Sequence, residues 1–265
     1  MIDTHCHIDD PQYAEGLETF LANQRESGVE AILVPGVDKT SVENVLAVCD
    51  RYPGYLFPAL GLHPENVKED WREQLASIKA AVDTSFASTP YTLHPTPRRR
   101  RLIAIGEIGL DYHWDVTFKE QQHEALREQM RWAEQYNLPV MIHSRDATED
   151  TLNILREFPT VKGVMHCFSE TEEYMHKFIG LGFYISFAGN ITFKKTDKTL
   201  LNSLPIDKIL VETDCPYLSP TPFRGKRNES AYVYYTALEI ANLRGITLEE
   251  LDLATTTNAQ NLFRI

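Results

Sequence analysis

Short apolar runs alternate with amphipathic segments along the whole chain. Eight apolar runs have the length of a buried strand: Met1–Ile2, Ala31–Val34, Leu56–Leu60, Leu102–Ile105, Val140–Ile142, Gly163–Met165, Phe183–Phe187 and Ile209–Val211. Helical spacing of apolar positions predicts the segments between them as helices: Glu15–Glu26, Thr40–Tyr52, Trp71–Val82, Phe118–Tyr136, Thr148–Glu157, Glu170–Leu181 and Ala231–Arg244. The pattern is weakest around 195–203, and two short helices are expected at the end of the chain, at Leu248–Ala254 and Thr257–Phe263.

Strands that alternate with helices are typical of a parallel sheet. Eight such repeats within 265 residues predict a (β/α)₈ TIM barrel that forms a single domain over residues 1–265. A doubly wound sheet is the alternative, but no glycine-rich nucleotide loop follows the first strand. Thr84–Arg101 is rich in Ser, Thr and Pro and ends in four arginines, so we expect a surface insertion there. It would be either a solvated loop or a contact for a phosphate backbone.

Side chains able to bind metal follow five of the predicted strands. They are His5, His7, Glu107, His143, His166 and Asp214. The carboxyl ends of the strands in a parallel barrel converge on one face, where the loops build the active site. A single histidine after a strand is more often structural, but six candidates at separate strand ends predict a metal centre.

The number and spacing of these residues favour two divalent ions. Residues two apart on a strand point the same way, so His5 and His7 can converge on one ion. Four histidines and two carboxylates exceed one tetrahedral shell, and Zn, Mn, Mg, Co or Ni are all compatible with them. We group His5, His7 and Asp214 on one ion and His143 and His166 on the other, with Glu107 as the bridge.

Such ions would activate a water molecule at neutral pH. Asp214 could ligate that water or accept its proton, so Asp214 and Glu107 are the predicted catalytic residues. Glu212 should face inward two residues before Asp214, either orienting a ligand as an outer partner, which we favour, or reaching the metals directly.

Four further residues are candidates for substrate binding. His63 ends the third strand, and Arg145 follows His143 by two residues. Arg224 and Lys226 flank a glycine after the last strand, where a basic loop could contact phosphates. For each of the four, a structural or solvated role is the alternative.

Composition and charge say less about function than these residues do. The net charge of −12 argues mildly against a general nucleic-acid binder, although local basic runs could still form a basic rim. The four cysteines lie far apart, so reduced thiols are expected, and strand alternation predicts that Cys6, Cys167 and Cys215 face the helix layer. Without a signal peptide or an apolar run of membrane length, we expect a soluble, cytoplasmic protein.

Taken together, these motifs resemble the TatD-related metal-dependent DNases, a branch of the amidohydrolase superfamily. The resemblance runs nearly end to end, through Asp3–His7, Gly61–Pro64, Gly106–Tyr112, Pro139–Ala147, His166–Ser169, Glu212–Leu218, Arg224–Glu229 and Asn258–Phe263. It implies a barrel, a divalent-metal site at the six residues above and DNase activity, with 3′-to-5′ exonuclease action on single-stranded DNA. Two features depart from the family pattern: Ser230 stands where proline is usual, and the insertion 84–101 is not common to the family.

Two other functions stay open at this point. The same site could hydrolyse a cyclic amide, a lactone or an aminoacyl ester, because function lies in the site and not in the barrel. Alternatively, the metals could stabilise a scaffold without turnover. The oligomeric state does not follow from the sequence.

Overall fold

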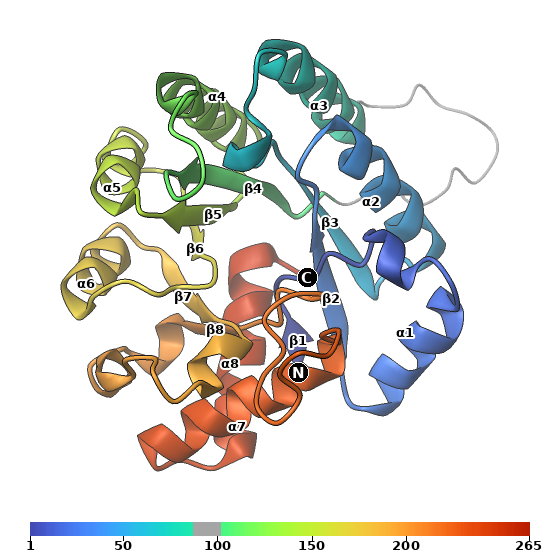
Figure 1. Cartoon of the computed structure of the whole chain (residues 1–265), viewed down its shortest axis with the longest axis vertical. Coiled ribbons are helices and arrows are strands. Elements are labelled where there is room, and N and C mark those ends of the chain that lie inside the picture. Colours follow the sequence, from blue (N-terminus) through green and yellow to red (C-terminus); the bar gives the residue numbers. More distant parts are fainter. Residues whose placement is uncertain (87–101) are drawn as a thin grey trace.

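A ring of parallel strands surrounded by helices forms the body of the molecule (Figure 1). The structure is a computed structural model that describes residues 1–86 and 102–265. Its eight-stranded sheet runs in sequence order from β1 to β8, and every neighbouring pair is parallel. The predicted (β/α)₈ barrel is therefore confirmed.

The strands follow the predicted apolar runs closely, with two exceptions. They are β1 Ile2–Asp3, β2 Ala31–Pro35, β3 Leu56–Leu60, β4 Ala104–Asp111, β5 Val140–Arg145, β6 Gly163–Met165, β7 Tyr184–Phe187 and β8 Ile209–Val211. Strands β4 and β5 extend beyond their apolar runs, because their pairing continues to Asp111 and Arg145. Glu107 and His143 therefore lie within strands, and the prediction that each follows its strand is wrong.

Helices connect successive strands from β1 to β7 on the outside of the ring, and two more follow β8 (Figure 1). They are α1 Leu17–Glu26, α2 Lys39–Arg51, α3 Trp71–Phe86, α4 Lys119–Tyr136, α5 Thr148–Arg156, α6 Glu172–Gly180, α7 Val233–Arg244 and α8 Leu248–Phe263. Only a short 3₁₀ turn, Thr199–Asn202, forms in the segment with the weakest helical pattern. None of the helices in the described ranges is long and apolar enough to cross a membrane.

Two predictions about helices need correction. The end of the chain forms one helix, α8, because its threonine run is held by burial of Thr255 and by the hydrogen bond from Thr256 Oγ1 to Asp252. The predicted insertion begins too early, since residues 84–86 complete α3. The rest of that insertion, residues 87–101, lies outside the described residues.

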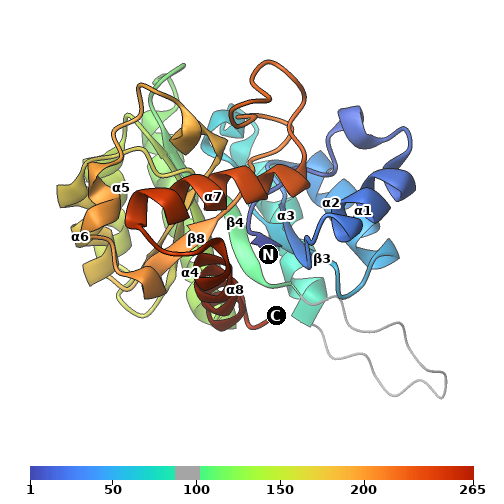
Figure 2. The same ribbon diagram turned by 90° about the horizontal axis from the view of Figure 1, so that it is seen from below.

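Helix α8 closes the end of the barrel opposite the carboxyl ends of the strands. Figure 2 shows α8 on the side of the strands where the C-terminus lies. Its residues Ala259, Leu262 and Phe263 share a buried cluster with inward side chains such as Leu33 and Met141. A second, larger cluster fills the space between the strands and the outer helices. The open end of the barrel is thus left for polar side chains.

Candidate metal centre

Polar side chains from five strands converge at the open end of the barrel. His5 Nε2 lies 3.2 Å from Glu107 Oε2, and His7 Nε2 lies 3.6 Å from Asp214 Oδ1. His143 Nδ1 and His166 Nε2 lie 3.1 and 3.5 Å from Glu107 Oε1. The structure therefore brings all six predicted ligands together.

Glu107 stands at the middle of this group and is 3% exposed. Besides the contacts above, His7 Nε2 lies 3.7 Å from its Oε2 and His63 Nε2 lies 3.4 Å from its Oε1. Burial alone would raise the pKa of Glu107, but the surrounding histidines outweigh it and hold that pKa well below its usual range. The carboxylate is thus ionised and offers both oxygens to the centre.

Four groups of side chains at the centre have ligand atoms close enough to share one ion, and two of them bear on the predicted pairing of ligands. The ligand atoms of His5, His7 and Asp214 lie within 4.8 Å of one another, which is the grouping expected from the sequence. In the second subgroup, His63 joins Glu107 and His143. His166, the expected partner of His143, has its ring centre 6.2 Å from that of His143. Sequence analysis placed His63 at the mouth only as a substrate contact.

The donor set fits divalent metal ions. Imidazole nitrogens with carboxylate oxygens suit zinc and similar ions, while carboxylates also accept harder ions. His5 Nε2 and His7 Nε2 lie only 3.3 Å apart, so a shared cation would satisfy both lone pairs. His5 Nδ1 is buried without a hydrogen-bond partner in the described part of the chain.

Carboxylates also set the charge state of two histidines. Burial alone would lower the pKa of His143, but contacts with Asp111 and Glu107 raise it to about 9. Burial has the same effect on His166, where Glu212 and Glu107 outweigh it and raise the pKa to about 10. Both imidazoles are therefore cationic near neutral pH when no metal replaces their protons.

Two outer carboxylates contact the predicted ligands. Glu212 Oε1 lies 2.9 Å from His166 Nδ1 and accepts a hydrogen bond from the backbone N–H of Cys167 at 2.7 Å. That is the place expected of an orienting residue. Asp111 Oδ2 lies 2.8 Å from His143 Nε2, a contact that sequence analysis did not assign. Asp111 lies six residues beyond the predicted apolar run Leu102–Ile105, and the sequence did not indicate that β4 continues to it and brings it to His143.

A glycine allows β4 and β5 to approach closely at the site. A Cβ atom on Gly109 would lie 1.8 Å from the carbonyl oxygen of His143, and its φ of +153° is rare for other residues. The close approach brings Asp111 and Glu107 of β4 beside His143 of β5. This glycine is therefore part of what builds the centre.

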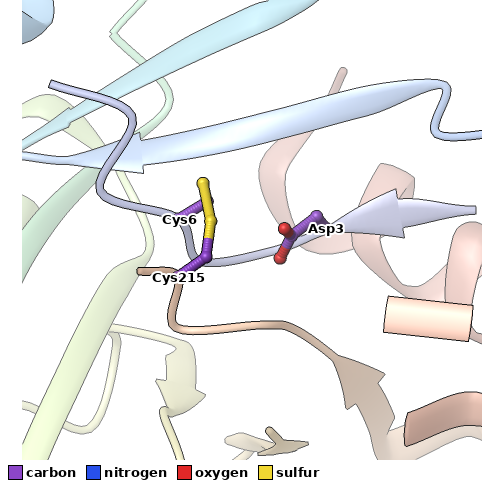
Figure 3. A group of neighbouring side chains, drawn as sticks. All are labelled: Asp3, Cys6 and Cys215. Atoms are coloured by element: carbon purple, nitrogen blue, oxygen red, sulfur yellow. A yellow bond between two sulfur atoms is a disulfide. The ribbon is translucent and has the colours of Figure 1, made fainter. Parts of the chain in front are cut away.

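Cys6 and Cys215 face the helix layer as predicted, but the prediction of reduced thiols is wrong for them, and the predicted orientation is wrong for Cys167. Cys6 and Cys215 form a disulfide with a Cα–Cα separation of 4.9 Å, beside the buried carboxylate of Asp3 (Figure 3). They lie opposite each other where β1 and β8 meet, a proximity that their separation of 209 residues conceals in the sequence. Cys167 lines the site cavity, because it follows the end of β6 with a φ of 45° and strand alternation no longer applies.

The centre lies in a cavity of roughly 910 Å³. Of the four predicted substrate contacts, His63 and Arg145 line this cavity. Arg224 and Lys226 are not among its lining residues. The Arg224 guanidinium instead lies 4.0 Å from the centre of the Phe193 ring, and Lys226 Nζ lies 5.8 Å from that of Phe223. The structure thus places only two of the four beside the metal centre.

Known proteins resemble the chain over its full length. The family described as TatD related DNase matches residues 2–264. The chain is 40% identical to the uncharacterized metal-dependent hydrolase YabD of Bacillus subtilis, over 100% of this chain and 99% of that protein. It is 36% identical to the uncharacterized metal-dependent hydrolase YcfH of Escherichia coli, over 100% and 96% of the two chains.

A solved structure agrees with these sequence matches. The crystal structure of YjjV, a TatD homolog from Escherichia coli, superposes with a TM-score of 0.89 at 30% identity. The match covers 100% of this chain and 98% of that one. The barrel, the cluster of histidines and carboxylates and these relatives agree, and the chain belongs to the TatD-related family of metal-dependent hydrolases.

Proposed function

We propose that this protein is a deoxyribonuclease that depends on two divalent ions and removes nucleotides from single-stranded DNA in the 3′-to-5′ direction. The observation that carries the proposal is the position of Arg145. Arg145 lines the same cavity as Glu107, His143 and Asp214, and no carboxylate of the described residues forms an ion pair with it. A cation left beside a hydrolytic centre suits a phosphodiester, which carries a negative charge at the scissile group.

Each predicted ligand has a place in this chemistry. His5, His7 and Asp214 would hold one ion, and Glu107 and His143 would hold the other together with His63 or His166. Bound divalent ions supply Lewis-acid activation of a water molecule and of the phosphoryl group. Asp214, partly exposed to the cavity with a pKa that neighbouring histidines keep low despite burial, would accept a proton from the attacking water.

The remaining residues would position the substrate. Arg145 would neutralise a non-bridging phosphate oxygen, and Glu212 would keep His166 oriented through the contact at its Nδ1. The P–O3′ bond breaks, the water oxygen forms the new bond to phosphorus, and the departing 3′ oxygen takes a proton from solvent. The products are a 5′-nucleotide and a DNA strand shortened by one residue.

A second function has one observation in its favour. Four carboxylates, Asp9, Asp10, Asp38 and Glu65, line the cavity on the side away from Arg145's strand. Such a rim suits a substrate with a positive group, for example the ammonium group of an aminoacyl ester, better than it suits a polyanion.

A substrate panel separates these functions. Protein stripped by a chelator and then reloaded with Zn, Mn, Mg, Co or Ni should be offered end-labelled single-stranded DNA, duplex DNA, RNA, an aminoacyl ester and a cyclic amide. We expect metal-dependent shortening of single-stranded DNA from its 3′ end, and a loss of at least about 100-fold in the isosteric variant Glu107→Gln. Turnover of the ester or the amide alone would refute the nuclease proposal.

A further inference from the structure

Two aromatic side chains in the wall of the site cavity are exposed to solvent. Trp114 follows β4 and is 72% exposed, and Tyr217 follows β8 and is 55% exposed. Both line the cavity that contains the metal centre. The other two tryptophans, Trp71 and Trp132, are buried at 6% and 2%. An exposed indole leaves a large apolar face in water, so its position beside a site points to a ligand surface.

The turn that carries Trp114 is tied directly to the metal centre. The backbone N–H of His113 donates to Asp111 Oδ1 at 2.8 Å, while Asp111 Oδ2 contacts His143 Nε2 at the same distance. The His113 ring meets the Trp114 ring edge to face, with centres 4.6 Å apart. His113 Nδ1 lies 2.8 Å from Asp146 Oδ2. The indole is therefore held in place without being covered.

The same indole neighbours the cation that we assign to phosphate binding. The guanidinium carbon of Arg145 lies 5.4 Å from the centre of the Trp114 ring, within the range of a cation–π contact. An aromatic face beside a guanidinium is the pairing that binds single-stranded nucleic acid, since the ring stacks on a base while the cation contacts the backbone.

Negative charge on the side of the cavity away from Arg145 restricts where a DNA strand can lie. Asp9, Asp38 and Glu65 line the part of the cavity contributed by the segments after β1, β2 and β3. These carboxylates would repel a phosphate backbone, whereas Arg145 would attract it. The favourable course for the strand is over the Trp114 side. Tyr217, with its ring 6.3 Å from that of His7, lies on the acidic side of the cavity, near the carboxylates of Asp10 and Asp9.

We propose that Trp114 is a specificity-determining residue that stacks on a nucleobase next to the scissile phosphate. This inference rests on the proposed action on DNA and names how the strand is held. Because every base has an aromatic face, the stacking selects for unpaired bases and not for a particular sequence. It accounts for a preference for single strands, whose bases are free to stack.

The first test measures binding in the absence of metal, so that no turnover occurs. An oligothymidylate of about 12 nucleotides is titrated into chelator-treated protein, with binding followed by fluorescence anisotropy of a label on the DNA. We expect Trp114→Ala to bind roughly 10- to 100-fold more weakly and Trp114→Phe, which keeps an aromatic face, to stay within about threefold of the unchanged protein. Leu253→Ala, at a residue 71% exposed on α8, is the matched control and should bind normally.

Abasic DNA separates stacking from a general loss of structure. An abasic oligonucleotide of the same length should bind the unchanged protein and Trp114→Ala equally, because it offers no base to stack. The oligothymidylate should also quench the intrinsic fluorescence, since Trp114 is the exposed tryptophan of the three. Equal losses for both oligonucleotides, or binding of oligothymidylate by Trp114→Ala within twofold of the unchanged protein, would overturn the inference.

A second test uses the metal-loaded enzyme. We expect Trp114→Ala to raise KM for single-stranded DNA about 10-fold or more while changing kcat little, because the indole touches a base and not the reacting atoms. Unchanged KM in an enzyme that cleaves DNA would refute the stacking role and leave the nuclease function intact. If the unchanged protein cleaves no DNA with any metal, the proposed function fails, and the binding experiment still decides whether Trp114 stacks on bases.

Discussion

At the scale of single residues, Glu107 and the histidines around it hold one another in opposite charge states. The carboxylate is ionised although it is buried, and contacts with Glu107, Asp111 and Glu212 raise the pKa values of His143 and His166. A metal ion can bind an imidazole only after that imidazole has lost its proton. The protons stored in the metal-free centre therefore compete with metal.

We predict that metal binding releases protons and tightens as the pH rises. At pH 8 the medium lies below the pKa of His143, about 9, and that of His166, about 10, so both are mainly protonated without metal. Affinity should increase between about pH 7 and pH 10, where these protons leave on their own. Titration calorimetry in HEPES and in Tris, whose ionisation enthalpies differ, measures the number of protons released.

The variant Asp111→Asn provides a control for this prediction. It removes the carboxylate whose contact with His143 Nε2 raises the pKa of that imidazole, so fewer protons should be released at pH 8. Binding heats that are the same in both buffers for the unchanged protein would contradict the assignment of charge.

The sequence was informative about which ligand candidates lie together at the metal centre, and less informative about the contacts between them. Strand ends converge in any parallel barrel, so the six ligand candidates could be found from their positions alone. The contact of Asp111 with His143 and the closeness of His63 to Glu107 depend on the lateral fit of β3, β4 and β5. Spacing along one strand contains no information about that fit.

At the scale of elements, α8 has a different role from the helices that surround the barrel. Its apolar face packs into the inner cluster of the strands and closes one end of the barrel. Its first turn carries a capping box, in which Thr247 Oγ1 accepts from the N–H of Glu250 and Glu250 Oε2 accepts from the N–H of Thr247. The main contribution of α8 is therefore the apolar side chains that it adds to the inner cluster of the barrel.

We predict that Phe263→Ala lowers the free energy of unfolding by about 3–5 kcal/mol, because Phe263 is 2% exposed and its removal leaves a cavity under the strands. Leu253→Ala, on the same helix but 71% exposed, should change it by less than about 0.5 kcal/mol. Urea unfolding followed by circular dichroism compares the two. Equal effects would show that α8 does not close the core.

Apolar periodicity located most elements but misjudged those whose ends are polar. Strands β4 and β5 continue past their apolar runs because inward positions near the open end carry Glu107 and His143. The sequence pattern predicts two helices where α8 forms one, because threonines have low helix propensity. Tertiary packing of the helix overrides that preference. Both errors arise where the surroundings of a residue, at the metal centre or in the core, determine its secondary structure more strongly than the apolar pattern of the nearby sequence does.

At the scale of the whole molecule, the barrel closes where its first and last strands meet. The N–H of Asp214 donates to the carbonyl of His5 at 2.9 Å, and the N–H of His7 donates to that of Cys215 at 2.8 Å. The Cys6–Cys215 disulfide crosses the same seam. The sequence could not reveal this bond, because no cysteine spacing indicates contacts between distant strands.

We predict that dithiothreitol lowers the unfolding free energy of the unchanged protein by about 5 kcal/mol, since the disulfide closes a loop of some 200 residues in the unfolded chain. The double variant Cys6→Ala, Cys215→Ala should be less stable and should not respond to the reductant, because Cys49 and Cys167 are free. Guanidinium unfolding with and without dithiothreitol measures both. A reductant effect that persists in the double variant would refute the prediction.

The contact between the segments after the first and last strands also determines when the metal centre can be completed during synthesis of the chain. His5 and His7 leave the ribosome before the rest of the centre, and Asp214, which completes their group, follows roughly 10–40 s later at ordinary rates of synthesis. A chain that stops before β8 has most of the barrel and all four predicted histidine ligands but lacks Asp214. Full ligation is therefore delayed until the segment after β8 has emerged, so a product terminated before β8 would carry an incomplete centre.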